Sequence, residues 1–306
     1  MTLTADSHRS AAGADASSGL PYPDIADVSH TTAEADGFFR SYFTAKTSKD
    51  IEATHAHFHP DKTAYFDATL GWGWTTNADL RKVWEQYMPG WTAEAKSYPT
   101  QILGDLISAV VFMTDTPELF GGEIRAIAVI DMEDGKIVRW VDYWDGRGFG
   151  NTDLVRSMRV PEESYPHELG ASTVTDRAGK IAEVAHEFNA ALAAGDADRA
   201  GELFAYDAQL EDMALRTQIR GQAAITRYLQ RAMPDLPYAQ APIRHIVGTD
   251  QGGGYEWHAA GGAAPRGATA LELSQDGKIT KLTVVWDGSL LDDTTIIAAA
   301  AHALDK

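Results

Sequence analysis

Apolar residues recur at helical spacing in two segments that lie far apart in the chain. The first is residues 33–45, AEADGFFRSYFTA, and the second is residues 178–194, AGKIAEVAHEFNAALAA. Residues three and four positions apart share one face of a helix, so both segments predict amphipathic helices. A second short helix is expected after each, starting near Asp50 and Asp196, because an aspartate accepts hydrogen bonds from the free N–H groups of a helix start.

Each predicted helix pair is followed by the same series of elements. A short strand (63–68, TAYFDA; 208–213, AQLEDM) precedes a further helix (78–88; 222–233) and about four strands. The last two strands form a hairpin through EDGK and QDGK, where Asp-Gly provides the positive φ angles of a tight turn. Helices come first and antiparallel strands last. Each series therefore predicts an α+β unit, with N-terminal helices packed on one face of a curved, mostly antiparallel sheet.

Landmark residues match between the two halves in the same order. The matching pairs are Asp50 with Asp196 at an offset of 146, Asp67 with Asp212 at 145, Ile102 with Ile246 at 144, and Trp144 with Trp286 at 142. An offset that falls slowly along the chain is typical of a duplication with small loop deletions. We therefore predict two tandem copies of one fold, an arrangement that resembles a dimer within one chain.

The composition of the connecting segments predicts where the copies begin and end. Residues 1–30, rich in Ser, Ala, Gly and Asp, are expected to be a flexible arm, and residues 151–175 a linker with Pro, Gly and Ser breaks. Residues 31–150 are then the first domain. Residues 176–306 are the second, which closes with a helix from Leu290 onward.

Charge and composition exclude several classes of function. The 306 residues include 44 acidic and 26 basic ones, and the net charge of −18 opposes binding to nucleic acid or to an anionic membrane surface. No cysteine is present, which excludes disulfides, thiolate metal sites and cysteine nucleophiles. No apolar run approaches the roughly 18 residues of a membrane span, and the N-terminus lacks the apolar core of a secretory signal. We expect a soluble, cytoplasmic protein that is a monomer or a homodimer.

The sequence also lacks the common signatures of cofactor and metal sites. It contains no Walker-type phosphate loop, no dinucleotide fingerprint and no Gly-x-Ser-x-Gly elbow. His55, His57 and His59 alternate, but this spacing does not place two ligands on one face of a helix. We therefore expect neither a cofactor nor a metal ion.

The order of elements, the LFAYDAQLED segment at 203–212, the Gly-led helix at Gly221 and the closing DGKI hairpin that ends in Trp resemble the nuclear-transport-factor-2-like superfamily, its SnoaL-like branch in particular. The resemblance covers both copies. It implies two cone-shaped α+β barrels, each opening on an apolar pocket. The superfamily includes ketosteroid isomerases, dehydratases, epoxide hydrolases and polyketide cyclases as well as proteins that only bind, so the fold alone does not settle the chemistry.

The tandem arrangement further resembles the polyether-forming epoxide hydrolases and cyclases. In those enzymes an Asp at the end of the first strand works with a Glu just after the following helix. The resemblance transfers these roles to Asp67 and Glu94 in the first copy. The second copy has Asp212, but Ala239 or Gln240 occupies the Glu position, which puts catalysis by that half in doubt.

The final strand of the first copy adds a third carboxylate. Alternation places Trp140, Asp142 and Trp144 on one mainly apolar face, which should point toward the core or pocket. Burial disfavours the charged form of a carboxylate, so the pKa of Asp142 should rise toward the range of a general acid or base. The alternative is that Asp142 only bonds a nearby Arg or Trp.

The first copy is also much more aromatic than the second, which suits a pocket for a large apolar substrate. Ordinary core packing is the alternative for any single member of this set. Arg125 could orient an acid or form a surface ion pair, and the second copy offers only Asp212 and Trp286. The aromatic candidates for substrate binding are Tyr65, Trp72, Trp74, Tyr87, Trp140, Tyr143 and Trp144.

Together these features predict a cofactor-independent enzyme that acts by acid–base catalysis on a hydrophobic polyketide-like or terpenoid molecule. Epoxide opening with cyclisation, isomerisation, hydration and dehydration all need a proton donor and acceptor across an apolar cavity, and the sequence does not choose among them. The alternatives are a non-catalytic module that binds a small molecule or a partner, and a pseudo-dimer whose second half is only structural.

Overall fold

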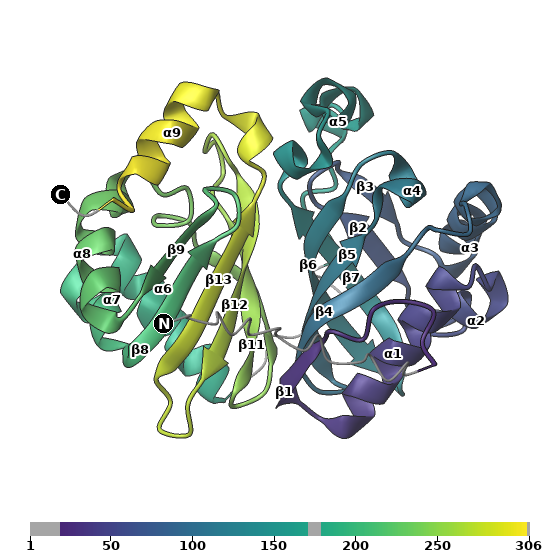
Figure 1. Cartoon of the computed structure of the whole chain (residues 1–306), viewed down its shortest axis with the longest axis horizontal. Coiled ribbons are helices and arrows are strands. Elements are labelled where there is room, and N and C mark those ends of the chain that lie inside the picture. Colours follow the sequence, from purple (N-terminus) through teal and green to yellow (C-terminus); the bar gives the residue numbers. More distant parts are fainter. Residues whose placement is uncertain (1–18, 171–178, 305–306) are drawn as a thin grey trace, which may run out of the picture.

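The computed structural model describes residues 19–170 and 179–304 and contains two α+β domains, as the sequence predicts (Figure 1). The first domain consists of β1 (Asp27–Thr31), α1 (Ala33–Thr47), α2 (Ile51–His55), β2 (Ala64–Asp67), β3 (Trp72–Trp74), α3 (Asn77–Tyr87), β4 (Ser97–Gly104), β5 (Ser108–Asp115), α4 (Pro117–Phe120), β6 (Ile124–Glu133), β7 (Lys136–Trp144) and α5 (Thr152–Met158). The second consists of α6 (Lys180–Ala193), α7 (Ala197–Glu202), β8 (Phe204–Asp212), β9 (Thr217–Arg220), α8 (Gln222–Ala232), β10 (Ile243–Gly248), β11 (Gly252–His258), β12 (Arg266–Leu273), β13 (Ile279–Trp286) and α9 (Asp293–Ala301). Short 3-10 turns follow α3, β7, α5, α8 and β13 at Met88–Gly90, Gly146–Phe149, Glu162–Ser164, Met233–Asp235 and Gly288–Leu290.

Local signals in the sequence account for several element boundaries. The side chains of Asp50 and Asp196 cap α2 and α7, as predicted. In the β6–β7 hairpin Asp134 and Gly135 have φ angles of 52° and 69°, the positive values that the Asp-Gly motif predicts. The equivalent β12–β13 turn is longer, and there Gly277 has the positive φ of 80°.

The two sheets have the same strand order, except that the first carries β1 as an additional edge strand. The order is β1-β4-β5-β6-β7-β2-β3 in the first domain and β10-β11-β12-β13-β8-β9 in the second. The four long strands pair antiparallel, whereas β2 and β8 pair parallel with the last long strand of their sheet. This parallel pairing sets Asp67 beside Asp142 in the first domain and Asp212 beside Val284 in the second. Asp67 and Asp212 therefore each lie next to the last long strand of their domain.

The sheets pack against each other, and the helices lie on the outer side of each (Figure 1). Apolar side chains on the faces of β5, β6, β7 and β12 that are turned away from the helices form this interface, including Val110, Val129 and Ala270. At one end of this interface, equivalent residues of the two domains form the same hydrogen bond in both directions. The Gly146 N–H donates to Asp287 Oδ1 at 3.0 Å, and the Gly288 N–H donates to Asp145 Oδ1 at 3.1 Å. Equivalent positions of the two copies therefore meet each other.

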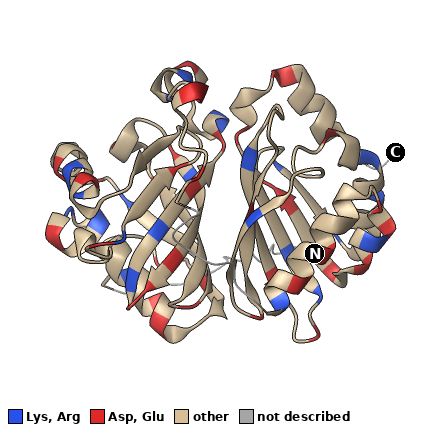
Figure 2. Cartoon of the chain, turned by 180° about the vertical axis from the view of Figure 1, so that it is seen from behind, with Lys and Arg blue, Asp and Glu red and all other residues tan. Residues whose placement is uncertain are grey.

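Charged residues occur on the strands of both sheets as well as on the outer helices (Figure 2), and some of them pair across the interface. Arg139 and Glu256 are fully buried, and the guanidinium donates to both carboxylate oxygens at 2.7 and 2.8 Å. Asp131 accepts from His245 at 2.9 Å beside them. Buried ions need partners because they have left water, so these groups fix how the two sheets align.

The Glu256→Gln substitution should destabilise the protein by about 3 kcal/mol, because it leaves the buried Arg139 guanidinium without its principal counter-charge. Urea unfolding measures the effect. Glu123→Gln, which removes a carboxylate that pairs with Arg125 at the surface, should change the free energy of unfolding by less than about 0.5 kcal/mol. Equal stabilities of the two variants would contradict the importance of the buried pair.

The connecting segments differ from the expectation at two places. Residues 27–30, expected to belong to a flexible arm, form β1 together with Thr31 and pair with β4. Residues 152–158, expected in a linker, form α5 because Asn151 caps a helix start there. Residues 19–26 of the predicted arm lie against the first domain, where Tyr22 is buried and donates to the Arg40 carbonyl at 3.2 Å. Residues 1–18 and 171–178 lie outside the described residues. In the part of the chain that is described, no helix is long and apolar enough to cross a membrane.

Candidate functional site

The first domain encloses a small cavity of about 70 Å³ between its helices and the concave face of its sheet. Three of the predicted residues, Tyr65, Asp67 and Asp142, reach it with polar groups, and Lys46 and Asp115 reach it from α1 and β5. The rest of its lining is apolar. This part of the lining comprises Leu70, Trp72, Trp74, Leu80, Val83, Trp84, Tyr87, Met113, Phe120, Ile124, Trp144 and Met158.

Asp142 lies at the back of the cavity, on the inner face of β7, as the alternation of that strand predicts. It is 5% exposed. The Tyr65 hydroxyl donates to one carboxylate oxygen at 2.6 Å, and the Trp140 indole N–H donates to the other at 2.6 Å. Burial raises the pKa of Asp142 to about 7, and the nearby Asp67 adds to the rise, although both hydrogen bonds oppose it. Asp142 therefore populates both protonation states near neutral pH.

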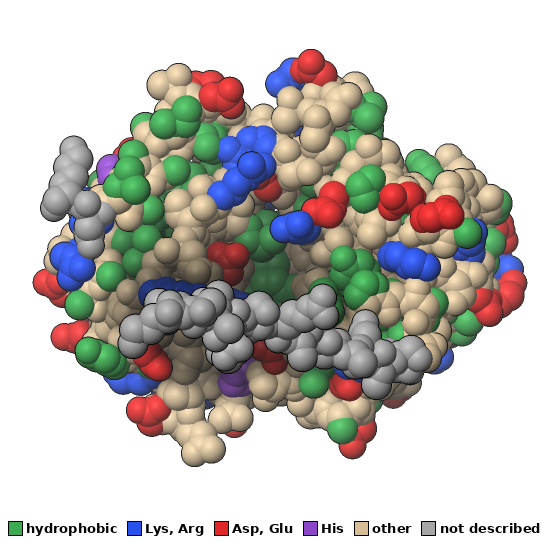
Figure 3. Space-filling model, in the orientation of Figure 1, with side chains coloured by type: hydrophobic (Ala, Val, Ile, Leu, Met, Phe, Trp, Pro, Cys, Tyr) green, Lys and Arg blue, Asp and Glu red, His purple; other side chains and the backbone are tan. Residues whose placement is uncertain are grey.

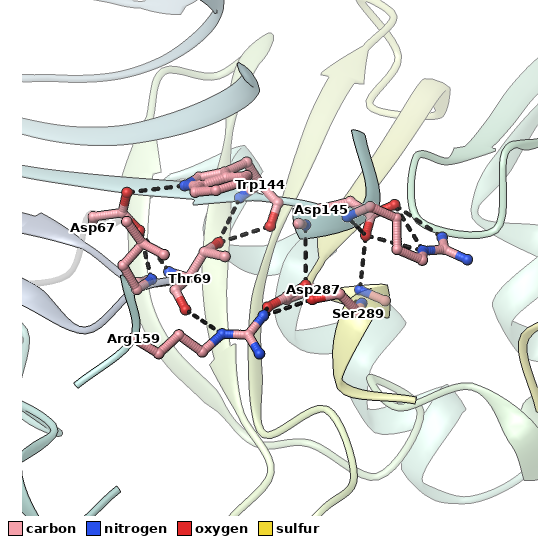
Figure 4. A network of polar contacts seen from close by, with 12 residues as sticks. Asp67, Thr69, Trp144, Asp145, Arg159, Asp287 and Ser289 are labelled. Carbon is pink, nitrogen blue, oxygen red and sulfur yellow. Dashed lines mark hydrogen bonds and ion pairs between the residues drawn. The ribbon is translucent and has the colours of Figure 1, made fainter. Parts of the chain in front are cut away.

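Asp67, at the end of β2, has its own set of donors (Figure 4). One oxygen accepts from the backbone N–H groups of Thr69 and Leu70 at 2.9 and 2.8 Å, and the other accepts from the Trp144 indole at 3.0 Å. Burial raises the pKa of Asp67 to about 6 against these three hydrogen bonds. The carboxylate thus holds the turn after β2 against the end of β7 and also faces the cavity.

Lys46 and Asp115 form a buried ion pair at the cavity that the sequence analysis did not predict. The Lys46 ammonium lies 3.1 Å from Asp115, and the two residues are 2% and 3% exposed. The Ser97 hydroxyl also donates to Asp115. The sequence does contain a signal that Lys46 is buried, because Lys46 lies seven residues after Phe39 and so shares the apolar face of α1. Lys46 acts on the site by lowering the pKa of Asp142.

Aromatic side chains form the outer wall of the cavity. Trp72 and Trp74 come from the edge strand β3, Tyr87 from the end of α3, and Phe120 from α4. All four are only partly buried. The Trp72 indole donates to the Met158 carbonyl at 2.8 Å, which attaches the end of α5 to this wall. The predicted roles of Trp72, Trp74 and Tyr87 at a pocket are compatible with these positions.

Four predicted residues do not line the cavity. Tyr143 lies on the opposite face of β7, in the interface between the sheets, because neighbouring side chains in a strand alternate. Trp140 is fully buried behind Asp142 and stacks on Tyr65. Arg125 points to solvent and pairs with Glu123. Glu94 is exposed in the turn before β4, where the Thr92 hydroxyl lowers its pKa, so the structure does not bring it to Asp67.

The second domain repeats the Asp67 arrangement without the rest of the site. Asp212 is fully buried and accepts from the Leu215 N–H at 2.9 Å and the Trp286 indole at 3.2 Å. Burial raises its pKa to about 6. The positions that match Lys46, Tyr65, Asp115 and Asp142 hold Leu192, Leu210, Ala259 and Val284. The predicted second-pocket residues Asp212 and Trp286 therefore lie together, but in an apolar core.

Comparison with known proteins agrees with this duplication. The SnoaL-like domain family matches residues 39–140 and again residues 185–282. No curated protein matches the chain. Similar solved structures include a candidate ketosteroid isomerase from Kribbella flavida, with 24% identity, a TM-score of 0.32, and coverage of 37% of this chain and 78% of that one.

Two further structures are similar to a comparable share of the chain. A SnoaL-like protein of unknown function from Burkholderia thailandensis is 14% identical, with a TM-score of 0.31 and coverage of 36% of this chain and 96% of that one. A nuclear-transport-factor-2-like protein of unknown function from Cytophaga hutchinsonii is 11% identical, with a TM-score of 0.32 and coverage of 38% and 94%. The two matched segments together span more than half of the 306 residues, and the chain belongs to the SnoaL-like domain family, of which it contains two copies in tandem.

Proposed function

We propose that the first domain is a cofactor-independent acid–base catalyst for an apolar small molecule, with Asp142 as the group that transfers the proton. The observation that carries this proposal is a carboxyl group that faces an aromatic cavity with a pKa of about 7. A general acid or base works best when its pKa lies near the operating pH. Protonated Asp142 donates to an epoxide or carbonyl oxygen, and ionised Asp142 accepts a proton from a hydroxyl, a C–H or water.

Asp67 and Lys46 have supporting roles in this proposal. Asp67 is a second carboxyl beside Asp142, and its charge favours the protonated form of Asp142. Lys46 presents a cation to the same cavity and stabilises negative charge that develops on a substrate oxygen. These groups fit epoxide opening with cyclisation, isomerisation, hydration and dehydration alike, since each of these reactions transfers a proton while the charge on a substrate oxygen changes.

The size of the cavity limits how a substrate binds. Small-molecule sites usually have volumes of about 300–1,000 Å³, whereas this cavity measures about 70 Å³. We infer that only the reactive end of the substrate enters it. The remainder of a polyketide-like or terpenoid molecule then lies against Trp72, Trp74 and Tyr87, and its binding moves these side chains and the end of α5 outward.

Activity toward two test compounds examines the proposal directly. A β,γ-unsaturated ketone reports isomerisation by the ultraviolet absorbance of the conjugated product, and an alicyclic epoxide reports opening by gas chromatography. Turnover that Asp142→Asn abolishes supports the proposal. Ligand binding without conversion by the wild type, detected by mass spectrometry of the recovered compound, would instead identify a binding module.

A double variant tests the role of Lys46. Lys46→Leu with Asp115→Ala gives the first domain residues of the types that the second has at these positions, and removes both charges together. We expect the variant to fold, because replacing a whole buried ion pair is often neutral for stability. Loss of the cation should raise the pKa of Asp142, so the pH–rate profile should shift to higher pH and kcat should fall. An unchanged profile would show that Lys46 has no part in the reaction.

A further inference from the structure

A second and larger cavity, of about 320 Å³, lies between the two domains. The first domain contributes the turn after β2, the end of β7 and the segment from Arg159 to Tyr165, and the second contributes the loop before β12 and the end of β13. Hydrogen bonds to the turn after β2 hold the segment from Arg159 to Tyr165 in place. The Val160 N–H donates to the Leu70 carbonyl at 2.9 Å, and the Tyr165 hydroxyl donates to the Ala68 carbonyl at 2.7 Å. The cavity is thus a structurally defined feature of the interface between the domains.

Two arginines face this cavity from opposite domains. The Arg266 guanidinium lies flat over the Tyr165 ring, 3.4 Å from its centre, and its side chain is only 10% exposed. Its ionic partner Glu162, at 3.1 Å, is 69% exposed, so water screens that attraction. Arg159 donates to the Thr69 carbonyl at 3.2 Å and pairs with Asp287 (Figure 4). Arg266 is therefore a cation in a fixed position and largely removed from water, and solvent weakens its attraction to Glu162.

Two histidines lie next to Tyr165. Its ring contacts that of His167, which in turn lies 6.4 Å from the ring of His258. Besides burial, Arg244 and Arg266 lower the pKa of His258, which shows that both cations act on this region. On the face of the molecule that Figure 3 shows, Lys and Arg side chains lie beside Asp and Glu along the upper part of the hollow between the domains. The lining holds two arginines and two acids, but Asp287 pairs with Arg159 and Glu162 is largely exposed, so Arg266 is the cation that favours a negatively charged ligand.

The remaining walls are apolar, with Leu70, Trp144, Trp286 and Leu290 among them. We propose that this interdomain cavity binds an amphipathic organic anion, whose carboxylate lies on Arg266 and whose aromatic or alicyclic body packs against the accessible apolar side chains of Val160, Pro265 and Leu290. Guanidinium groups suit this role because they present paired N–H donors to a carboxylate. The cavity volume is at the lower end of the range of small-molecule sites, so a molecule with one or two rings fits.

Calorimetric titration with 2-naphthoate tests the proposal, with naphthalene-2-carboxamide as the uncharged probe of the same shape. We expect one naphthoate to bind per chain. Arg266→Gln should weaken naphthoate binding by about tenfold to a hundredfold, since a charge-assisted hydrogen bond is lost, and should leave binding of the amide unchanged. Arg220→Gln, which removes the same charge from an exposed site on β9, is the matched control and should bind naphthoate normally.

A second variant keeps the test independent of Arg266. Ala263 is an exposed residue at the cavity, so Ala263→Trp should obstruct the cavity without disturbing the core, and should weaken both probes. The proposal is overturned if naphthoate does not bind at millimolar concentration. It is equally overturned if Arg266→Gln and Ala263→Trp both bind naphthoate as the wild type does, which would place the probe in the cavity beside Asp142.

Discussion

Asp142→Asn should lower kcat by about 10²- to 10⁴-fold, the usual contribution of a positioned general acid or base. The asparagine keeps the shape of the side chain and can still bond both neighbours, since its carbonyl accepts from Trp140 and its amide donates to the Tyr65 hydroxyl. The cavity should therefore persist while proton transfer is lost. Steady-state kinetics on whichever test compound is turned over measures the effect.

Matched control variants distinguish a loss of proton transfer from a general effect of substitution on kcat. Asp153→Asn changes an aspartate that is 88% exposed on α5 and should leave kcat within twofold of the wild type. Glu94→Gln and Arg125→Gln should do the same, because the structure places both side chains in solvent. Full activity of Asp142→Asn would remove Asp142 from the mechanism, whereas a loss in Glu94→Gln would restore the role that the resemblance to epoxide hydrolases assigns to it.

The fold and the main carboxylate follow from simple periodicities. Period-two alternation along residues 138–144 puts Asp142 on the inner face of its strand, where the structure has it. The same rule puts Tyr143 on the opposite face of the strand, which is turned away from the helices, where it lies in the interface between the sheets instead of the cavity. Alternation decides such positions because a strand has only two faces, and the apolar one must be buried.

Residues that depend on loops or on distant pairings are harder to predict. Glu94 follows a 3-10 turn, whose path no periodicity describes, and it emerges in solvent. Lys46 and Asp115 are 69 residues apart, so their pairing is a result of tertiary structure. Lys46 could still have been found, because a lysine on the apolar face of a helix needs a buried partner.

Comparison of the two copies separates structural from functional carboxylates. Asp67 and Asp212 make the same bonds to a backbone N–H three residues later and to an indole, although the second domain lacks the other polar groups. This shared arrangement supports the turn after the first strand in both domains. Asp142, in contrast, corresponds to Val284, so the fold does not require a carboxylate there. The proposed function gives a reason for a buried carboxyl group at this position.

The free energy of unfolding should depend on the protonation of Asp142, so this protonation can be measured without a substrate. The pKa of Asp142 is about 7 in the folded protein, against 3.8 for an ordinary aspartate. The folded state therefore holds a proton that the unfolded state has lost between these pH values, and stability should fall as the pH rises through this window. At about 1.4 kcal/mol per pH unit, the cost of ionising Asp142 in the folded protein amounts to about 4 kcal/mol above pH 7.

Urea unfolding of the wild type and of Asp142→Asn at pH 5 and pH 8 isolates this contribution, because every other titrating group is common to both proteins. His245, whose partner Asp131 raises its pKa despite burial, also favours the folded state at low pH but cancels in the comparison. Asp142→Asn should gain stability relative to the wild type by about 3 kcal/mol on going from pH 5 to pH 8. Parallel curves for the two proteins would mean that Asp142 is ionised throughout, and that its carboxyl group cannot act as the acid in the proposed reaction.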